Sequence, residues 1–134
     1  MQDFPRLGHV SMTVRSCDAS RPWYNALFGT EPVLDGYDTD DGRHVVWALP
    51  GGTFFAVREH PGKTLTGDQF SEFRLGLDHA SFHCQSRAGL EEWKRQLDGL
   101  GYIHGDIVDA PYGSGLAFRD PDGNALEFFA MPGA

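Results

Sequence analysis

The chain has 134 residues, 40% of them hydrophobic and 13% aromatic, and carries a formal net charge of −8. This length and composition predict one folded domain and exclude a disordered chain. The negative charge argues against nucleic acid and membranes as partners, because both are anionic. No apolar run approaches the roughly 18 residues of a membrane span, the N-terminus is unlike a signal peptide, and two cysteines make no disulfide framework. We therefore expect a reduced, cytoplasmic protein.

The first half of the chain predicts a strand, a helix and three more strands. The expected ranges are a strand at 7–14, a helix at about 19–28, and strands at about 31–37, 44–49 and 53–58. Alternation in the first strand places His9 and Ser11 on one face, opposite the apolar side chains. We expect Asp18 or Ser20 to cap the start of the helix and Gly29 to end it.

After a turn-rich connection at about 61–74, the same order of elements begins again. The expected ranges are a strand at 76–84, a helix between Ser86 and Gly101, and strands at about 103–108, 114–119 and 124–130. Here Ser86 is the predicted N-cap of the helix and Gly101 its end. His79 and Ser81 repeat, in this second opening strand, the positions of His9 and Ser11.

Three landmarks repeat at nearly one offset. His9 and His79 are 70 residues apart, Gly29 and Gly101 are 72 apart, and Pro50 and Pro121 are 71 apart. The chain therefore has an α+β fold made of two β-α-β-β-β modules, the first at about 5–60 and the second at about 75–131. Because each module is small for burying its own sheet, we expect the two sheets to combine, within one chain or across a dimer.

The last strand of the second module carries an acid in an apolar run. It follows a turn, Asp120-Pro-Asp-Gly123, in which Pro121 sets its own φ and Gly123 can adopt a positive φ. Alternation places Glu127 on one strand face with Ala125 and Phe129. A carboxylate in this setting is costly to bury without a positive partner, which a metal ion or a buried arginine could supply.

The repeat makes a metal the stronger of these two explanations. His9 and His79 open the two modules on equivalent strand faces, and Glu127 lies on the last strand of the second. Two imidazoles and one carboxylate on rigid strands match a facial triad that leaves positions open for water, substrate or oxygen. Zn²⁺ held by two histidines and a glutamate, with one open position, fits the same residues.

These residues resemble the vicinal oxygen chelate superfamily, which contains glyoxalases, bleomycin-resistance proteins and extradiol dioxygenases. The resemblance rests on the paired modules, the opening histidines and the ending Asp120-Pro-Asp-Gly-Asn-x-x-Glu127. It implies curved mixed sheets around a metal-binding cleft, with His9, His79 and Glu127 as ligands of a divalent ion, Fe²⁺ or Mn²⁺ first and Zn²⁺ or Ni²⁺ as alternatives. It also implies a homodimer, with a site built within one chain or shared by two.

Two positions depart from particular branches of the superfamily. Ala56 stands where the repeat offset places the first-module counterpart of Glu127, and glyoxalase I and methylmalonyl-CoA epimerase have a Glu or Gln ligand near there. Ala117 stands where extradiol enzymes carry a tyrosine, three residues before the Asp of the turn. Neither alanine can bind a metal or transfer a proton, so the resemblance leaves the reaction open.

Several other side chains are candidates for the site. His83 shares the strand face of His79 and could act as an acid or base, or simply lie at the rim. Tyr112 could donate to a substrate oxyanion or be an ordinary loop aromatic. Arg119 could bind an anionic substrate or pair with Asp120 or Asp122. The residues whose positions suit a pocket wall, with core packing as the alternative for the aromatic ones, are Trp47, Phe54, Ala56, Ala117, Arg119 and Phe129.

The residues and the resemblance together predict a glyoxalase-like or dioxygenase-like metal enzyme, that is a lyase, isomerase, transferase or dioxygenase, acting on a small, partly hydrophobic, oxygenated molecule. A different class remains open beside it, a drug-binding protein of the bleomycin-resistance type that sequesters its ligand without chemistry. The net negative charge of this chain would suit the binding of cationic drugs. Removal of metal separates the two, because a chelator abolishes the enzyme and leaves a metal-free binding site intact.

Overall fold

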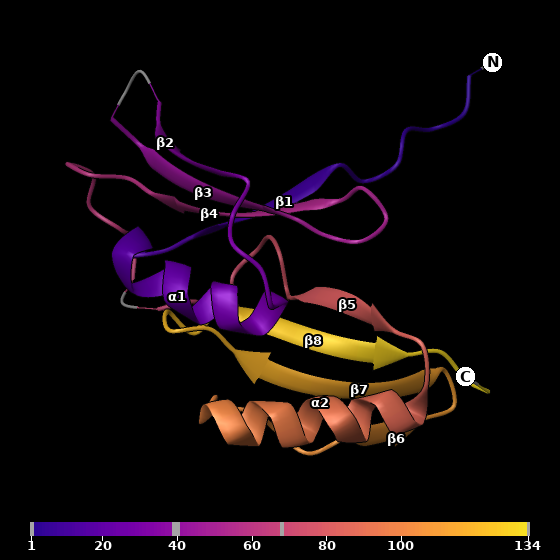
Figure 1. Cartoon of the computed structure of the whole chain (residues 1–134). Coiled ribbons are helices and arrows are strands. Elements are labelled where there is room, and N and C mark those ends of the chain that lie inside the picture. The colour runs from indigo at the N-terminus through magenta and orange to yellow at the C-terminus, as the bar shows by residue number, and fades with distance from the viewer. Residues whose placement is uncertain (1, 39–40, 68, 134) are drawn as a thin grey trace. The chain divides into compact units, whose positions relative to one another are not determined.

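A computed structural model describes residues 2–38, 41–67 and 69–133 (Figure 1). The chain divides into two compact units, residues 1–66 and 67–134, and each is treated by itself. Each unit has one helix and a four-stranded mixed sheet, which confirms the predicted α+β fold with two β-α-β-β-β modules. That the two modules make up one domain remains a prediction. No helix among the described residues is long and apolar enough to cross a lipid bilayer.

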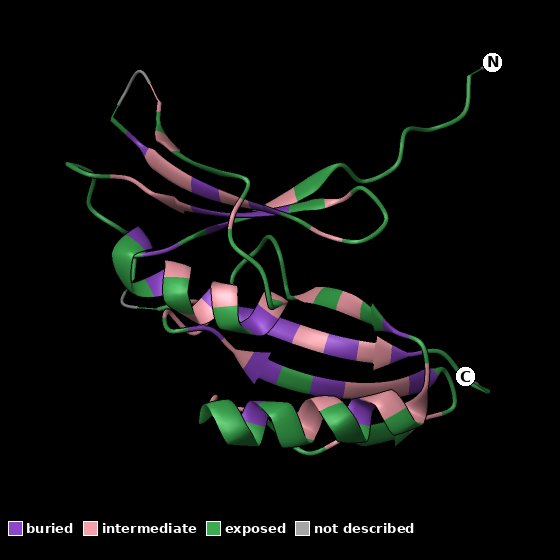
Figure 2. Ribbon diagram, in the orientation of Figure 1, coloured by how far each residue is buried: buried purple, intermediate pink, exposed green. Residues whose placement is uncertain are grey.

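Unit 1 contains β1 and α1 followed by three strands. Their bounds are β1 His9–Thr13, α1 Cys17–Phe28, β2 Leu34–Tyr37, β3 Arg43–Ala48 and β4 Phe54–Glu59. The sheet order is β1-β4-β3-β2, with β1 parallel to β4 and the other pairs antiparallel. The core lies between this sheet and α1, where Tyr24, Trp47 and Phe55 are fully or almost fully buried (Figure 2).

Unit 2 repeats this architecture. Its elements are β5 Ala80–Cys84, α2 Arg87–Leu100, β6 Val108–Ala110, β7 Gly113–Arg119 and β8 Ala125–Ala130. The sheet order is β5-β8-β7-β6, with β5 parallel to β8. Leu90 and Leu97 of α2 are completely buried, and Trp93 stacks on Phe128 of β8 with ring centroids 4.2 Å apart. In both units the helix covers one face of the sheet, and the opposite face carries the candidate site residues of the strands other than Trp47.

The helix ends follow the local sequence, with one correction. Gly29 and Gly101 end α1 and α2 in the left-handed conformation, and Ser86 caps α2 by accepting from the amide of Gly89, all as predicted. The predicted cap of α1, Asp18 or Ser20, is wrong. Ser16 is the N-cap, accepting from the amide of Ala19 at 3.2 Å. The carboxylate of Asp18 instead pairs with Arg43 of the sheet, a tertiary contact that local sequence does not reveal.

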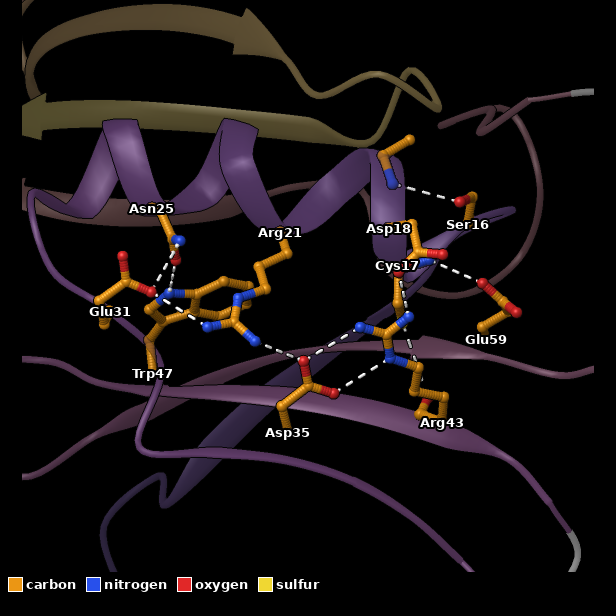
Figure 3. Close-up of polar contacts among 11 residues, drawn as sticks. Ser16, Cys17, Asp18, Arg21, Asn25, Glu31, Asp35, Arg43, Trp47 and Glu59 are labelled. Carbon is orange, nitrogen blue, oxygen red and sulfur yellow. Dashed lines mark hydrogen bonds and ion pairs between the residues drawn. The ribbon is translucent and has the colours of Figure 1, made fainter.

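A network of polar contacts joins α1 to its sheet (Figure 3). Arg43 of β3 donates to Asp35 of β2 through two nitrogens, each at 3.0 Å, and these contacts lower the pKa of Asp35 and raise the pKa of Arg43. The amide of Cys17 donates to the carboxylate of Glu59 at 2.7 Å. Burial and the nearby Glu59 raise the pKa of the Cys17 thiol to about 11, so this cysteine stays protonated and inert near neutral pH.

Two strands of unit 2 are shorter than the sequence predicts. The strand expected at 103–108 is β6 at Val108–Ala110, and His104 forms only an isolated bridge with Phe118. The chain still runs beside β7 there, because the amide of Gly105 donates to the carbonyl of Ala117. The strand expected at 76–84 begins only at Ala80.

Candidate functional site

The face of the unit 2 sheet opposite α2 gathers several of the predicted site residues. Glu127 lies on β8, with Ser81 of β5 as its register partner on one side and Ala117 of β7 on the other. The side chain of Glu127 is 24% exposed, so its carboxylate reaches solvent from the middle of the sheet. The serine hydroxyl donates to Glu127 Oε1 at 2.9 Å and holds the carboxylate over the strands.

His79 faces this carboxylate from the residue before β5. Its Nε2 lies 3.6 Å from Glu127 Oε1, while its Nδ1 lies 2.6 Å from a carboxylate oxygen of Asp78. A hydrogen on Nδ1, donated to Asp78, leaves the lone pair of Nε2 directed toward the Glu127 side. This is the arrangement of a metal-binding histidine, whose second nitrogen is usually oriented by a carboxylate.

Gly115 of β7 provides the space that Glu127 occupies. A Cβ atom at Gly115 would lie 2.9 Å from Glu127 Oε2 and 3.7 Å from the ring of Phe129. The absence of a side chain therefore lets the carboxylate lie flat against the neighbouring strand. Gly115, Ser81 and Asp78 were not among the predicted site residues. Ser81 had a signal in its position two residues after His79, and Asp78 had one in the motif Gly76-x-Asp-His79; Gly115 had none.

His83 and Tyr112 lie farther along the same face. His83 is exposed and is the register partner of Phe129, so it shares the predicted face with Glu127. Tyr112 is 72% exposed, and its ring stacks on Phe129 with an interplanar angle of 12°. Both side chains are placed where a ligand above the sheet could contact them, and their chemical roles remain predictions.

Arg119 is paired, but with a different acid from the two predicted. Its two terminal nitrogens lie 3.1 and 3.3 Å from the two carboxylate oxygens of Glu72, and one of them also donates to the carbonyl of Gly123. Arg119 holds the pKa of Glu72 below its usual range. The expectation of a structural partner in Asp120 or Asp122 is thus replaced by Glu72, from the segment that precedes β5.

The turn before β8 has the predicted form. Asp120 is buried and its carboxylate accepts the amides of Asp122 and Asn124 and the side-chain amide of Asn124, at 2.8 to 2.9 Å. Gly123 has φ +79°, the positive value expected there. Because Asp120 satisfies the amides inside this turn, it is a structural residue that fixes where β8, and with it Glu127, begins.

The corresponding face of unit 1 mixes apolar and polar side chains and has an alanine at the position that matches Glu127. Ala56 is the register partner of Ser11, as Glu127 is of Ser81, which supports the predicted equivalence of Ala56 and Glu127. His9 is exposed and pairs in register with Phe54, whose side chain is 41% exposed. In unit 1 the imidazole of His9 therefore lies beside an aromatic ring, whereas in unit 2 the imidazole of His79 lies beside a carboxylate.

Trp47 belongs to the core of unit 1. Its side chain is fully buried, it lies on the α1 face as the register partner of Phe55, and its indole donates to Asn25 at 2.8 Å. Phe54 and Ala56 lie on the other face of the same sheet. The prediction that Trp47 lines a pocket together with them is therefore wrong, and its alternative, core packing, is confirmed.

A cluster of polar side chains on the face of the unit 1 sheet opposite α1 was missed by the sequence analysis. His44 of β3 and Arg58 of β4 are register partners, and both contact the carboxylate of Asp38, with His44 Nδ1 at 3.0 Å from it. The three residues come from different parts of the sequence and show no spacing motif. Only strand pairing brings them together.

The residues that could hold a metal are His79 and Glu127 in unit 2 and His9 in unit 1. With each unit taken by itself, the described residues contain no group of three His, Cys, Asp or Glu side chains arranged to hold an ion. The His79 and Glu127 pair nevertheless fits a divalent cation, because the atoms that would bind it face each other and Asp78 and Ser81 orient them.

The protein was compared with known families and structures. A family profile, the Glyoxalase/Bleomycin resistance protein/Dioxygenase superfamily, matches residues 6–128. A crystal structure of a glyoxylase/bleomycin resistance protein/dioxygenase domain from Frankia sp. EAN1pec is 35% identical, with a TM-score of 0.84 and coverage of 96% of this chain and 99% of that one. No curated protein sequence gives a significant match.

Two more distant structures share the fold. The glyoxalase family protein from Enterococcus faecalis is 19% identical, with a TM-score of 0.77 and coverage of 94% of this chain and 98% of that one. The fosfomycin resistance protein FosX from Listeria monocytogenes, solved with Mn(II) and a sulfate ion, is 19% identical, with a TM-score of 0.68 and coverage of 96% and 93%. The predicted resemblance is confirmed: the chain belongs to the Glyoxalase/Bleomycin resistance protein/Dioxygenase superfamily.

Proposed function

We propose that the protein is a metal-dependent enzyme in which His79 and Glu127 bind a divalent ion together with His9. The observation that carries the proposal is the facing pair of unit 2, with His79 Nε2 3.6 Å from Glu127 Oε1. A histidine oriented by Asp78 and a carboxylate held by Ser81 are preorganised for one ion. The superfamily includes metal-dependent enzymes, and the distant FosX structure contains Mn(II).

The bound ion, Fe²⁺ or Mn²⁺ first and Zn²⁺ or Ni²⁺ as alternatives, would polarise an oxygen of the substrate or bind dioxygen. Around it, Asp78 keeps the Nε2 lone pair of His79 available, and Ser81 fixes one oxygen of Glu127. Two groups on the same face supply proton chemistry in this proposal. The exposed imidazole of His83 can act as an acid or base, and the exposed hydroxyl of Tyr112 can donate to a developing oxyanion.

The substrate of this proposal is a small, oxygenated and partly hydrophobic molecule. Apolar surface is supplied by Phe54 and Ala56 in unit 1 and by Phe129 with the stacked Tyr112 in unit 2. We also propose a homodimer, because in each unit a helix covers only one face of the sheet and the faces with the site residues are left for another surface. His9 would come from the same chain or from the second copy.

A sequestering protein of the bleomycin-resistance type is the alternative from another class. Two observations favour it. The net charge of −8 suits cationic drugs, and Ala56, which cannot bind a metal, stands in unit 1 at the position that matches Glu127. Chelation distinguishes it from the enzyme. Treatment with EDTA should abolish the activity of a metal enzyme but leave drug binding unchanged.

The first test is metal content, measured by elemental analysis on protein purified without a metal-affinity tag. We expect about one equivalent per chain in the wild type and little in Glu127→Ala. Glu92→Ala, which removes an exposed glutamate of α2, is the matched control and should keep the full equivalent. A wild type that is empty and cannot be loaded with Fe²⁺, Mn²⁺, Zn²⁺ or Ni²⁺ would overturn the proposal and favour sequestration.

A further inference from the structure

Unit 2 contains a cavity that the proposed metal chemistry does not use. It has a volume of about 490 Å³ and opens beside the turn that precedes β8. It is lined by Gln69, Phe70, Ser71, Glu72, Phe73, Arg74, Arg119 and Gly123. Two of these residues are arginines and one is an acid, so the lining is positively charged in a chain whose net charge is −8.

Arg119 at this cavity holds a carboxylate in a two-pronged contact. The oxygens of Glu72 lie 3.1 and 3.3 Å from its two terminal nitrogens. Planar guanidinium and carboxylate groups match in this geometry, which is how proteins bind the carboxylates of ligands. The side chains of Arg119 and Glu72 are 37% and 30% exposed, so the pair is hydrated and a competing carboxylate can reach it.

Glu72 belongs to a segment, residues 69–74, that forms no helix or strand. The amide of Phe70 donates to the carbonyl of Asp122 at 3.0 Å, and Gln69 lies over Gly123. The ring of Phe73 is 91% exposed and adds apolar surface at the rim. Glu72 can therefore leave Arg119 by a local shift of this segment while the β7–β8 hairpin keeps its hydrogen bonds.

Arg119 also shares a sheet row with His79. Arg119 of β7 is the register partner of Ala125 of β8, and Ala80 pairs with Leu126, so His79 lies level with Ala125 on the far side. Two strand spacings separate the two Cα atoms, about 10 Å. A small molecule bound by Arg119 can thus extend along the sheet over the small side chain of Ala125 toward His79.

We propose that this cavity binds the carboxylate of a small, partly apolar acid, which takes the place of Glu72 on Arg119. Glu72 then acts as an internal competitor that occupies the arginine when no ligand is bound. The two-pronged contact supplies the recognition of the carboxylate, and Phe70 and Phe73 supply the apolar contacts. The inference goes beyond the proposed function, because it requires only residues of unit 2 and no metal ion.

The test is titration with benzoate of protein freed of metal by a chelator, followed by calorimetry. We expect benzoate to bind, its neutral analogue benzamide not to bind, and Glu72→Gln to raise the benzoate affinity about fivefold or more. Arg119→Gln should abolish binding. Glu92→Gln, which makes the same change of charge on an exposed turn of α2, is the control and should bind as the wild type does.

Equal benzoate affinity in Glu72→Gln and Glu92→Gln would overturn the proposal. If either pocket variant fails to fold, the wild type alone decides, because NMR can follow the Nε–H resonance of Arg119. Benzoate should shift this resonance saturably and benzamide should leave it unchanged, and no shift at about 100 mM benzoate would also overturn the proposal. Inorganic phosphate in a parallel titration shows whether the site selects carboxylates, and phosphate binding more tightly than benzoate would contradict the stated ligand class.

Discussion

At the scale of single residues, the position of one carboxylate depends on a glycine across the strand. Glu127 Oε2 occupies the space where Gly115 has no Cβ, while Ser81 holds the other carboxylate oxygen. Both contacts lie on the exposed side of the sheet, where packing of the core does not require them. We infer that they serve the carboxylate rather than the fold.

Gly115→Ala should therefore weaken metal binding more than it affects stability. Its new Cβ, 2.9 Å from Glu127 Oε2, displaces the carboxylate from His79 and Ser81, and we expect a loss of affinity of about tenfold or more. Titration of chelator-treated protein with Mn²⁺ measures this loss. Gly99→Ala in α2, where the added methyl meets no atom within 4 Å, is the control. Unchanged Mn²⁺ affinity in Gly115→Ala would contradict the role given to this glycine.

Part of the candidate site could be predicted from the sequence, and part could not. His9 and His79 were predicted as ligands because the repeat places them at equivalent positions, and Glu127 because it is an acid in the apolar run of the last strand; their ligand role stays a prediction. Gly115 and Glu72 were not predicted, since each acts on a side chain distant in the sequence, 12 residues away for Gly115 and 47 for Glu72. Trp47 was misplaced because alternation alone fixes which residues share a face but not which face of the sheet the helix covers.

At the scale of elements, His104 joins the end of α2 to the segment that follows it. Its Nδ1 contacts the carbonyl of Gly105 at 2.6 Å, and its Nε2 contacts the carboxylate of Asp98 in α2. The contact with the Gly105 carbonyl, and then that with Asp98, raise the pKa of His104 above its ordinary value of 6.5. The charged imidazole is therefore more favoured in the folded protein than in the unfolded chain.

A raised pKa makes a definite prediction for stability against pH. The contribution of His104 is fully present below the unfolded pKa, about 6.5, and is lost as the pH rises through the higher folded pKa. His104→Gln should thus lower the free energy of unfolding more at pH 5.5 than at pH 9, measured by urea denaturation. In an Asp98→Asn background, the effect of His104→Gln on the free energy of unfolding should differ less between pH 5.5 and pH 9. That background lacks one of the two contacts that raise the pKa of His104. A penalty for His104→Gln that does not change with pH would contradict this account.

The elements themselves were predicted best where local chemistry determines them. The Asp120-Pro-Asp-Gly123 turn and the glycine ends of both helices appear as expected, because each depends on the residue's own φ preference. The start of α1 differs, because Ser16 is its cap and Asp18 pairs with Arg43. The strand β6 is shorter than expected, because His104 makes only an isolated bridge beside β7. Such contacts depend on which strands are neighbours.

At the scale of the whole molecule, the proposed metal site needs residues from both units. His9 lies in unit 1, and His79 and Glu127 lie in unit 2. His9→Ala and Glu127→Ala should each lose metal when prepared alone. If the metal site is shared by two chains, mixing the two variants restores it. The Glu127→Ala chain then supplies His9, and the His9→Ala chain supplies Glu127.

The mixing experiment uses the two variants unfolded together, refolded and analysed for metal. Recovery of a clear fraction of the wild-type metal content shows a shared site, and no recovery shows a site within one chain. His9→Gln mixed with His9→Ala is the control and should recover nothing in either case. Full metal content in His9→Ala alone would contradict the ligand role of His9.

The sequence by itself determined the two-module organisation and the sheet face shared by His79 and Glu127, because repeat spacing and alternation are properties of the chain, and its motifs carried the resemblance to the superfamily. The tertiary structure decided what surrounds these positions. Strand pairing brings Ser81, Gly115 and His79 to Glu127, buries Trp47 against α1, and gives Arg119 the acid Glu72 as its partner. These contacts join residues far apart in the sequence, so their geometry follows from register and packing rather than from any local pattern.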